Sequence, residues 1–342
     1  MGRLVSEGAV ICFGEMLIRF SPPDQELLLQ SPALKVSYGG AEANVAVGLS
    51  RLGRRARMVS VVPDNDLGRA AVGELRRWGV DVSGVRYGPG RMGLYFVTPG
   101  AALRSTEVLY DRTHSAFSRA KAADFDWERE LQGASWLHLS GITPALGPSG
   151  LEACVTAASV ARARGVKVCF DGNYRANLWA ERPGEAPAVL RQLLSRADLA
   201  LVNERDLALV LGRDFPGEDE LASRADAAAE AFAAFPWLKR IAALLRSTGP
   251  GGQHQLAATM ATRERSIVAE PLGLPAIVDR IGAGDAFAAG LLHGLLGDAT
   301  EEAALATGLR SAAHKHGVPG DFSMATAADL ANFDAPWTDV RR

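Results

Sequence analysis

Short apolar segments alternate with longer segments of helical periodicity along most of the chain, and this alternation is the strongest constraint on its fold. The strand-like segments lie at 9–14, 56–62, 134–141, 166–171, 197–203, 239–246 and 255–261. The helix-like segments lie at 41–53, 66–80, 148–165, 217–235, about 284–297 and about 300–316. Strands that alternate with helices form a parallel sheet covered on both faces. The sequence therefore predicts an α/β fold with functional loops at the carboxyl ends of its strands.

Two segments depart from this alternation, namely residues 15–38 and 83–115. Both are rich in strand formers and turn residues, and neither carries helix signals. We expect them to form a small β lid over the carboxyl edge of the sheet. The length of 342 residues fits one α/β domain that carries such a lid, and the sequence shows no internal repeat, low-complexity tract or interdomain linker.

The composition is that of a globular enzyme, with 48% hydrophobic and 22% charged residues and a formal net charge of −2. This charge gives no reason to expect a nucleic-acid or membrane partner, and no apolar run reaches the ~18–20 residues of a membrane-spanning helix. Cys12, Cys154 and Cys169 are odd in number and show no CxxC spacing. They are typical of reduced, buried cysteines, so we expect a cytoplasmic protein.

Two glycine clusters are candidate nucleotide loops. Residues 88–93, "GPGRMG", match GxGxxG but lead into the strand-like "LYFVT", whereas a dinucleotide fingerprint opens a helix. We interpret this segment as a hairpin turn, and it is the sole support for the alternative of an NAD(P)-dependent oxidoreductase. Residues 249–254, "GPGGQH", either turn the chain between two strands or approach a nucleotide, and the spacing favours the turn.

The segment that carries chemistry is "DRIGAGDAFAAG", residues 279–290. Free amide groups at a helix start attract anions, so the N–H groups of residues 282–285 can converge on a phosphate oxygen. Asp285 would then lie beside a transferring phosphoryl group, where a carboxylate can deprotonate the attacking hydroxyl. The alternative from this segment alone is a capped helix that packs closely through its small residues.

The wider sequence resembles the ribokinase (PfkB) family of sugar kinases over residues 9–325. The resemblance is carried in chain order by 39–53 "GGAEANVAVGLSRLG", 137–146 "LHLSGITPAL", 203–206 "NERD" and 279–290 "DRIGAGDAFAAG". Within the family, "GLYF", "YDRTHSAF" and "DGNYRANLW" look most like 2-keto-3-deoxygluconate kinases. The resemblance implies one kinase domain, a ribokinase-like three-layer α/β/α sandwich with the lid segments inserted in it.

The resemblance also implies roles for the glycine-rich motifs. Asp285 matches the catalytic base, and Gly282, Ala283 and Gly284 match the anion hole. The glycine pair of the sugar pocket corresponds to Gly39 and Gly40, where missing side chains let sugar hydroxyls reach the backbone. Asn44, one turn into the following helix, either bonds a sugar hydroxyl or only satisfies the loop before that helix.

An acidic sugar is favoured by the residues expected in the lid. Tyr110 and Arg112 are two apart in a strand-like stretch and share a face, and Tyr95 on the preceding strand can join them. Rings against carbon and a guanidinium against a carboxylate suit a sugar acid. Arg175 supplies a second cation, and Asp171 is expected to orient its loop.

The nucleotide side departs further from the family pattern. Asn203 matches the first position of an NxxE motif, and Asp206 stands where glutamate is usual. We expect Asp206 to reach Mg²⁺ through water. Arg246, Ser247 and Gly249 are the candidate nucleotide contacts, together with Asn203, Gly282 and Gly284. Arg280 replaces a threonine common in the family, which puts any monovalent-cation site in doubt.

The sequence therefore predicts an ATP- and Mg²⁺-dependent kinase. Its expected reaction is phosphorylation of the terminal hydroxyl of 2-keto-3-deoxygluconate, which gives 2-keto-3-deoxy-6-phosphogluconate. Three alternatives stay open: a kinase of fructose, ribose or a related sugar acid, a non-catalytic sugar sensor, and the oxidoreductase. Lids of this family often pair between subunits, so a homo-oligomer is expected, with the number of subunits and the sugar epimer left open.

Overall fold

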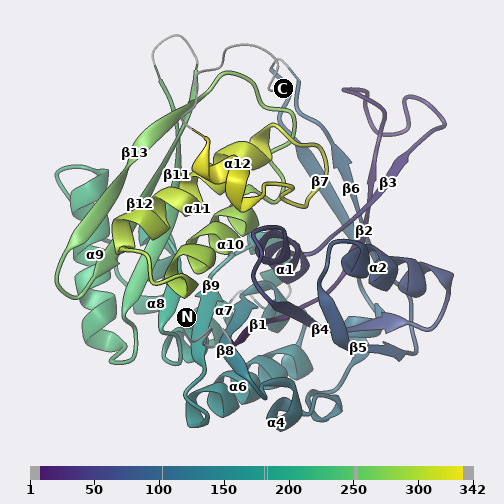
Figure 1. Ribbon diagram of the computed structural model, residues 1–342, viewed down its shortest axis with the longest axis horizontal. Coiled ribbons are helices and arrows are strands. Elements are labelled where there is room, and N and C mark those ends of the chain that lie inside the picture. The colour runs from purple at the N-terminus through teal and green to yellow at the C-terminus, as the bar shows by residue number, and fades with distance from the viewer. Residues whose placement is uncertain (1–7, 102, 181, 183, 250–252, 334–342) are drawn as a thin grey trace, which may run out of the picture.

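A nine-stranded sheet forms the centre of the chain (Figure 1). The computed structural model describes residues 8–101, 103–180, 182, 184–249 and 253–333. In spatial order the strands are β13 (Ser266–Leu274), β12 (His254–Thr262), β11 (Arg240–Thr248), β10 (Leu199–Leu201), β9 (Lys167–Asp171), β8 (Ala134–Ser140), β1 (Ala9–Phe13), β4 (Ala56–Pro63) and β5 (Asp81–Gly88). Neighbours from β11 to β5 pair in parallel, and β12 is antiparallel to both of its neighbours.

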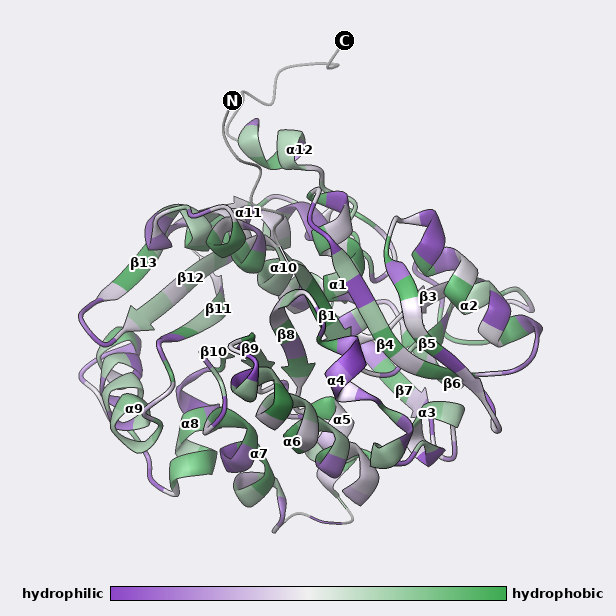
Figure 2. Cartoon of the chain, turned by 60° about the horizontal axis from the view of Figure 1, so that its bottom comes forward, coloured by the Kyte–Doolittle hydropathy of each residue, from purple (hydrophilic) through white to green (hydrophobic). Residues whose placement is uncertain are grey.

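Helices cover both faces of this sheet (Figure 2). One face carries α1 (Ala41–Arg51), α2 (Asp66–Arg77), α10 (Ala283–Leu296) and α11 (Glu301–His316). The other face carries α6 (Pro148–Ala163), α7 (Ala186–Leu194), α8 (Glu204–Leu211) and α9 (Glu220–Ala234). Each helical layer forms its own buried apolar cluster against the sheet. The predicted α/β/α sandwich is therefore confirmed.

Short elements complete the described chain. They are α3 (Ala116–Arg119), α4 (Trp127–Glu130), α5 (Ile142–Ala145), α12 (Ala327–Ala331) and the 3₁₀ turns η1 (Ala122–Asp124) and η2 (Ala176–Trp179). Within the described ranges, no helix combines the length and apolar character needed to cross a membrane.

A second, four-stranded sheet lies to one side of α1 (Figure 1). Its order is β3 (Lys35–Gly39), β2 (Leu17–Ser21), β6 (Gly93–Thr98) and β7 (Glu107–Asp111). The expected small β structure is thus present, but residues 83–88 belong to β5 of the large sheet, where they pair with β4. The segment 88–93 joins the two sheets, so its interpretation as a hairpin turn is wrong. Because it leads into β6, the helix that a dinucleotide fingerprint requires is missing.

The sequence patterns missed α7, α8 and β13. The sequence of β13, "SIVAEPLGL", contains a proline and a glycine, which weaken strand signals but are tolerated in an edge strand. Helix α8 is short, and its start depends on a reciprocal cap between Asn203 and Asp206. In the sequence, the same two residues predict only phosphate and metal contacts.

Candidate active site

A cavity of about 370 Å³ lies between the two sheets, and we call it the central cavity. Its walls come from residues after β1 and β9, from β11, from the small sheet, and from the first turns of α1 and α10. This is the position that the carboxyl-end rule for parallel sheets predicts. The sequence-predicted residues among its lining are Gly40, Asn44, Tyr95, Tyr110, Arg112, Arg175, Arg246, Gly282, Ala283, Gly284 and Asp285.

The N-terminal turn of helix α10 lines this cavity with backbone atoms. Gly282 is the N-cap, with φ of 81°, and a Cβ there would lie 2.0 Å from the carbonyl oxygen of Asp321. Only glycine fits this left-handed, crowded position. At Gly284 a Cβ would meet nothing within 4 Å, so the cavity side of the turn is open. The first-turn N–H groups lack acceptors inside the helix, and the Ala283 N–H donates only a long 3.4 Å bond to the Arg280 carbonyl oxygen. The turn therefore suits an anion.

Asp285 has the electrostatics of a general base. Burial, together with the nearby carboxylates of Asp171, Asp321 and Glu42, raises its pKa to about 8. The hydrogen bond donated by Asn44 opposes this rise. A carboxyl group with a pKa near neutral is well matched to accept a proton from a hydroxyl at physiological pH.

The contact between α1 and α10 explains how Asn44 reaches Asp285. A Cβ at Gly48 would lie 2.8 Å from the Cβ of Ala289, so the helices touch where Gly48 has no side chain. Asn44 and Asp285 each lie four residues before these contact residues and therefore on the same helix faces. The small-residue crossing thus places the amide against the carboxylate.

Two buried acceptor atoms in the cavity wall lack partners in the described chain. They are Oε1 of Glu15 and Oδ1 of Asn44. Buried polar atoms in proteins are almost always hydrogen-bonded, and unpaired ones need an explanation. Hydroxyl groups of a ligand would satisfy both. Glu15 follows β1 and was not singled out in the sequence.

Arg112 is held by the protein rather than left free for a ligand. Its Nε donates to Glu15 Oε2 at 2.9 Å, and both side chains are buried. The sequence predicts Arg112 as a contact for the sugar carboxylate, and no local pattern indicates Glu15 as its partner in the chain. Arg112 still lines the cavity, beneath the ring of Tyr110, which in turn stacks on Tyr95.

Tyr95 and Gly39 also have structural partners. The hydroxyl of Tyr95 donates to Asp321 Oδ2, and a Cβ at Gly39 would lie 2.2 Å from that same oxygen. Gly39 therefore makes room for Asp321 and does not line the central cavity, unlike its neighbour Gly40. Asp321 lies in a loop after α11, where no sequence pattern marked it as a site residue.

Three guanidinium groups converge on the central cavity, and we call Arg175, Arg246 and Arg280 the arginine cluster. None of the three forms an ion pair or side-chain hydrogen bond within the described part of the chain, although the charge of Arg175 acts on the carboxylates of Asp171 and Asp206. Burial lowers the pKa of Arg246, and the charges of Arg280 and Arg175 lower it further. Neighbouring unpaired cations repel one another, so an anionic ligand between them would be stabilising.

A second cavity of about 200 Å³, the side cavity, adjoins the first. Asn203, Asp206 and Asp171 line it, and Gly284 lines both cavities. Asn203 Oδ1 accepts from the N–H groups of Arg205 and Asp206, while Asp206 Oδ2 accepts from the Asn203 N–H. This capping box occupies one oxygen of each side chain and fixes both at the start of α8.

The side cavity fits a magnesium ion that is also bound by phosphate. Burial and the nearby Asp206 carboxylate raise the pKa of Asp171 to about 7, against the opposing charge of Arg175, and burial also raises the pKa of Asp206. A divalent cation would relieve this repulsion. The described residues hold no cluster of three or more candidate ligands. Mg²⁺ needs few protein ligands, because it keeps water and binds substrate phosphates.

Two predicted nucleotide residues lie outside both cavities. Ser247 pairs with Gln255 in the β11–β12 ladder, and the N–H of Gly249 donates to the carbonyl of Gln253 at 2.8 Å. The structure thus brings Arg246 into the central cavity and leaves Ser247 and Gly249 at the hairpin end. Residues 250–252, which belong to the same predicted loop, lie outside the described residues.

Glu42 is a further site residue that sequence reasoning missed. It is fully buried, its Oε1 accepts from the Ser140 hydroxyl at 2.5 Å, and burial raises its pKa. A Cβ at Gly14 would overlap its carboxylate, so the glycine that ends the first strand pattern makes room for it. Its place inside the glycine-rich motif at 39–53 was the signal available.

A parallel α/β sandwich with an anion-binding helix start beside a half-buried base defines a phosphotransferase of the ribokinase-like class. The sequence profile of the pfkB family carbohydrate kinases matches residues 8–326, and the chain belongs to this family. It is therefore a kinase that transfers a phosphoryl group to a sugar hydroxyl.

Relatives of known name differ in their sugar. The 2-dehydro-3-deoxygalactonokinase of Haloferax volcanii is 33% identical over 325 residues, which cover 94% of this chain and 95% of that protein. Fructokinase-1 of Zea mays is 31% identical over 291 residues, which cover 84% of this chain and 83% of that protein. The crystal structure of 2-dehydro-3-deoxygluconokinase from Thermotoga maritima superposes with a TM-score of 0.89 at 37% identity, covering 95% of this chain and 98% of that one.

Proposed function

We propose that this kinase phosphorylates the terminal hydroxyl of a 2-keto-3-deoxy sugar acid, with 2-keto-3-deoxygluconate as the first candidate and its galactonate epimer as the second. The observation that carries this proposal is the arginine cluster, because three unpaired guanidinium groups exceed what a neutral sugar needs. The names of the Haloferax and Thermotoga relatives support the same substrate class.

In the proposed reaction Asp285 takes the proton of the terminal hydroxyl. The hydroxyl oxygen forms a bond to the γ-phosphorus of ATP, and the bond from that phosphorus to the bridging oxygen of ADP breaks. The first-turn amides at Gly282, Ala283 and Gly284 stabilise the charge on the phosphoryl oxygens. Asn44 fixes the carboxylate by its 2.6 Å hydrogen bond.

The walls of the central cavity would orient the sugar acid. Oε1 of Glu15 and Oδ1 of Asn44 accept hydroxyl donors, while Tyr110 presents its ring to the carbon chain. The arginine cluster binds the carboxylate and shares the charge of the transferring phosphate. In the side cavity, Asp171 and Asp206 would hold Mg²⁺ through water, and the ion neutralises phosphate charge when bound.

The proposal is tested by ADP release from ATP and Mg²⁺ with 2-keto-3-deoxygluconate, 2-keto-3-deoxygalactonate, fructose and ribose measured side by side. Turnover on the sugar acids alone is the expected result, and the ratio between the two epimers then ranks them. Turnover on fructose, the sugar named for the Zea mays relative, would refute carboxylate recognition. Binding of a sugar without ADP release would instead indicate the sensor.

The small sheet is proposed to be a lid that also joins two copies of the chain. Leu109 and Val36 are more than half exposed, and Phe20 stacks on Phe96 on the same face of this sheet. Apolar side chains gathered on a sheet face favour a protein contact. Sedimentation of the wild type and of Leu109→Glu tests this, with a dimer and a monomer as the expected results.

A cytoplasmic location is also part of the proposal. The three cysteines of the chain are free and buried, as is common where thiols are kept reduced.

A further inference from the structure

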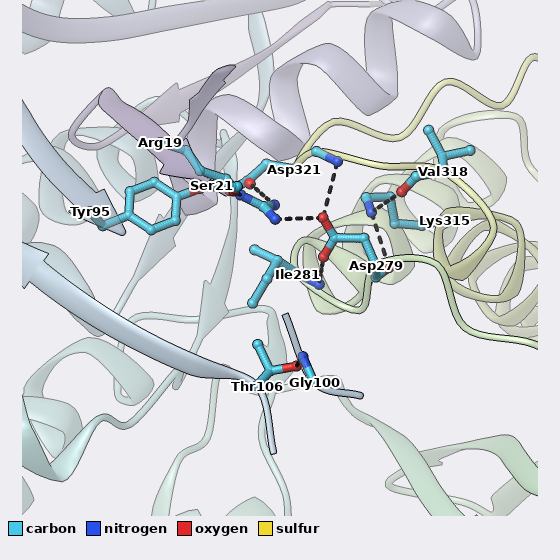
Figure 3. A network of polar contacts seen from close by, with 11 residues as sticks. Arg19, Ser21, Tyr95, Gly100, Thr106, Asp279, Ile281, Lys315, Val318 and Asp321 are labelled. Carbon is cyan, nitrogen blue, oxygen red and sulfur yellow. Dashed lines mark hydrogen bonds and ion pairs between the residues drawn. The ribbon is translucent and has the colours of Figure 1, made fainter. Parts of the chain in front are cut away.

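The loop that leads into the anion hole is fixed by polar contacts centred on Asp279 (Figure 3). Asp279 Oδ1 accepts from the Ile281 N–H at 2.9 Å, and Oδ2 accepts from the Gly320 N–H at 3.0 Å. Arg19 of β2 forms ion pairs with Asp279 at 2.7 Å and with Asp321 at 2.9 Å. The carboxylate therefore ties the loop both to the small sheet and to the segment after α11.

Lys315 enters this network from the opposite side. It lies in the last turn of α11 and is 0% exposed. Its Nζ donates to the carbonyl oxygen of Asp279 at 3.3 Å and to that of Val318 at 2.8 Å (Figure 3). A lysine that only capped its own helix would bind carbonyls of that helix end. Lys315 instead bridges the segment after α11 to the loop before Gly282.

The cost of burying this ammonium group is offset by charges around it. Burial lowers the pKa of Lys315, and the carboxylates of Asp279, Asp321 and Asp285 oppose that change. Arg19, which faces the same carboxylates, adds to the lowering. The ammonium group thus lies between two carbonyl oxygens, with carboxylates beyond them, and carbonyl oxygens are the groups that replace the hydration shell of a monovalent cation in proteins.

We propose that the Lys315 ammonium group is the built-in monovalent cation of this site, and that it positions the loop presenting the amides of residues 282–284. Lys315 is a positioning residue in this account, because it touches the loop and not the substrate. The inference deepens the proposed function, since it relies on these amides binding the transferring phosphate. It implies that turnover needs no dissociable alkali cation.

The first test compares wild-type turnover in potassium chloride and in tetramethylammonium chloride, with Mg²⁺ held constant. The acceptor is whichever sugar the wild type phosphorylates, so an error in the proposed substrate does not decide the result. Equal turnover in the two salts is expected. A requirement for potassium would overturn the proposal, since a fixed ammonium group would then be insufficient.

The second test uses Lys315→Ala and the length-matched Lys315→Met. Both are expected to lose about 10²-fold in kcat, as misplacement of a reacting group by ~1 Å does, with the KM for sugar little changed. Ammonium or potassium ions should restore Lys315→Ala, because its carbonyl oxygens are open to a small cation. They should not restore Lys315→Met, in which the side chain fills that space.

Melting temperature gives a readout that is independent of catalysis. Ammonium chloride should raise the melting temperature of Lys315→Ala above its value in tetramethylammonium chloride and leave the wild type unchanged. Lys239→Ala, which removes an exposed lysine paired with Asp198, is the matched control and should behave as the wild type. If Lys315→Ala folds and small cations restore neither turnover nor melting temperature, the proposal is refuted. If it does not fold, the wild-type comparison decides.

Discussion

Asn44 donates a 2.6 Å hydrogen bond to Oδ2 of Asp285, from the first turn of one helix to the first turn of another 241 residues away. A donor to the charged form of a carboxyl group favours ionisation. The amide thus limits the rise in pKa that burial causes at Asp285.

The pH dependence of catalysis should report this contact. Asp285 acts as a base in its ionised form and has a pKa of about 8, so kcat/KM should rise with pH and level off above that value. Asn44→Ala removes the donor and should shift the rising part of the pH profile of kcat/KM, which we call the acidic limb, to higher pH. A shift of about one pH unit lowers kcat/KM about tenfold on the acidic side. An acidic limb at the same pH in Asn44→Ala and the wild type would show that Asn44 does not change the pKa of Asp285.

Replacing the base should separate catalysis from stability. Asp285→Asn is expected to lower kcat by about 10²–10⁴-fold, the usual contribution of a general base, while ATP still binds. The carboxyl binds its proton more tightly in the folded chain, at about 8, than in the unfolded chain, near 3.8. Raising the pH through that interval therefore removes stability from the wild type.

The amide of Asp285→Asn does not ionise, so this variant does not lose folding stability through this group as the pH rises. At pH 8 its melting temperature should exceed that of the wild type by roughly 2 °C or more, and the difference should shrink toward pH 4. Calorimetry of both proteins across this range provides the measurement. A variant that melts below the wild type at pH 8 would contradict the assigned environment of Asp285.

The ion pair between Arg112 and Glu15 should behave as a structural unit. Arg112→Met leaves the Glu15 carboxylate buried without its partner, which typically costs about 3–5 kcal/mol of unfolding free energy. Adding Glu15→Gln to that variant should recover much of the loss, and urea denaturation of the wild type and the two variants measures it. If Arg112→Met is instead as stable as the wild type and only weakens sugar binding, Arg112 contacts the ligand after all.

A single methyl group at the helix crossing should weaken catalysis. Gly48→Ala places a Cβ 2.8 Å from that of Ala289, whereas ordinary van der Waals contact begins at 3.4 Å, so α1 and α10 must move apart. Because Asn44 and Asp285 lie one turn away, their hydrogen bond should lengthen. The rising part of the pH profile of kcat/KM should then shift to higher pH, as in Asn44→Ala. Gly73→Ala on α2, where a Cβ meets nothing within 4 Å, is the matched control.

The main architecture could be predicted from the sequence because alternation and periodicity are local signals. The β1, β8 and β9 patterns each matched a buried strand, and the glycines before α1 and α10 marked both helix starts. Most predicted site residues that lie on these starts do line the central cavity. Local patterns cannot show partners distant in the chain, which is why the partners of Arg112 and Gly39 could not be predicted. Glu15 pairs with Arg112, and Asp321 occupies the space beside Gly39.

Loop geometry was also beyond the sequence patterns. Residues 83–88 have strand-forming side chains that suit either sheet, and only pairing with β4 assigned them to the large one. Ser247 and Gly249 have the residue types of a nucleotide loop, but the hairpin register carries them past the cavity.

Because Gly48 has no side chain, the packing of two helices in the hydrophobic core helps to set the pKa of the catalytic carboxyl group. Two apolar surfaces, formed by residues that never meet substrate, set how closely an amide approaches a carboxylate one helical turn away. Selection for a different working pH therefore has targets among residues that pack in the core and do not line the cavity. A survey of variants that looked only at cavity-lining positions would overlook them.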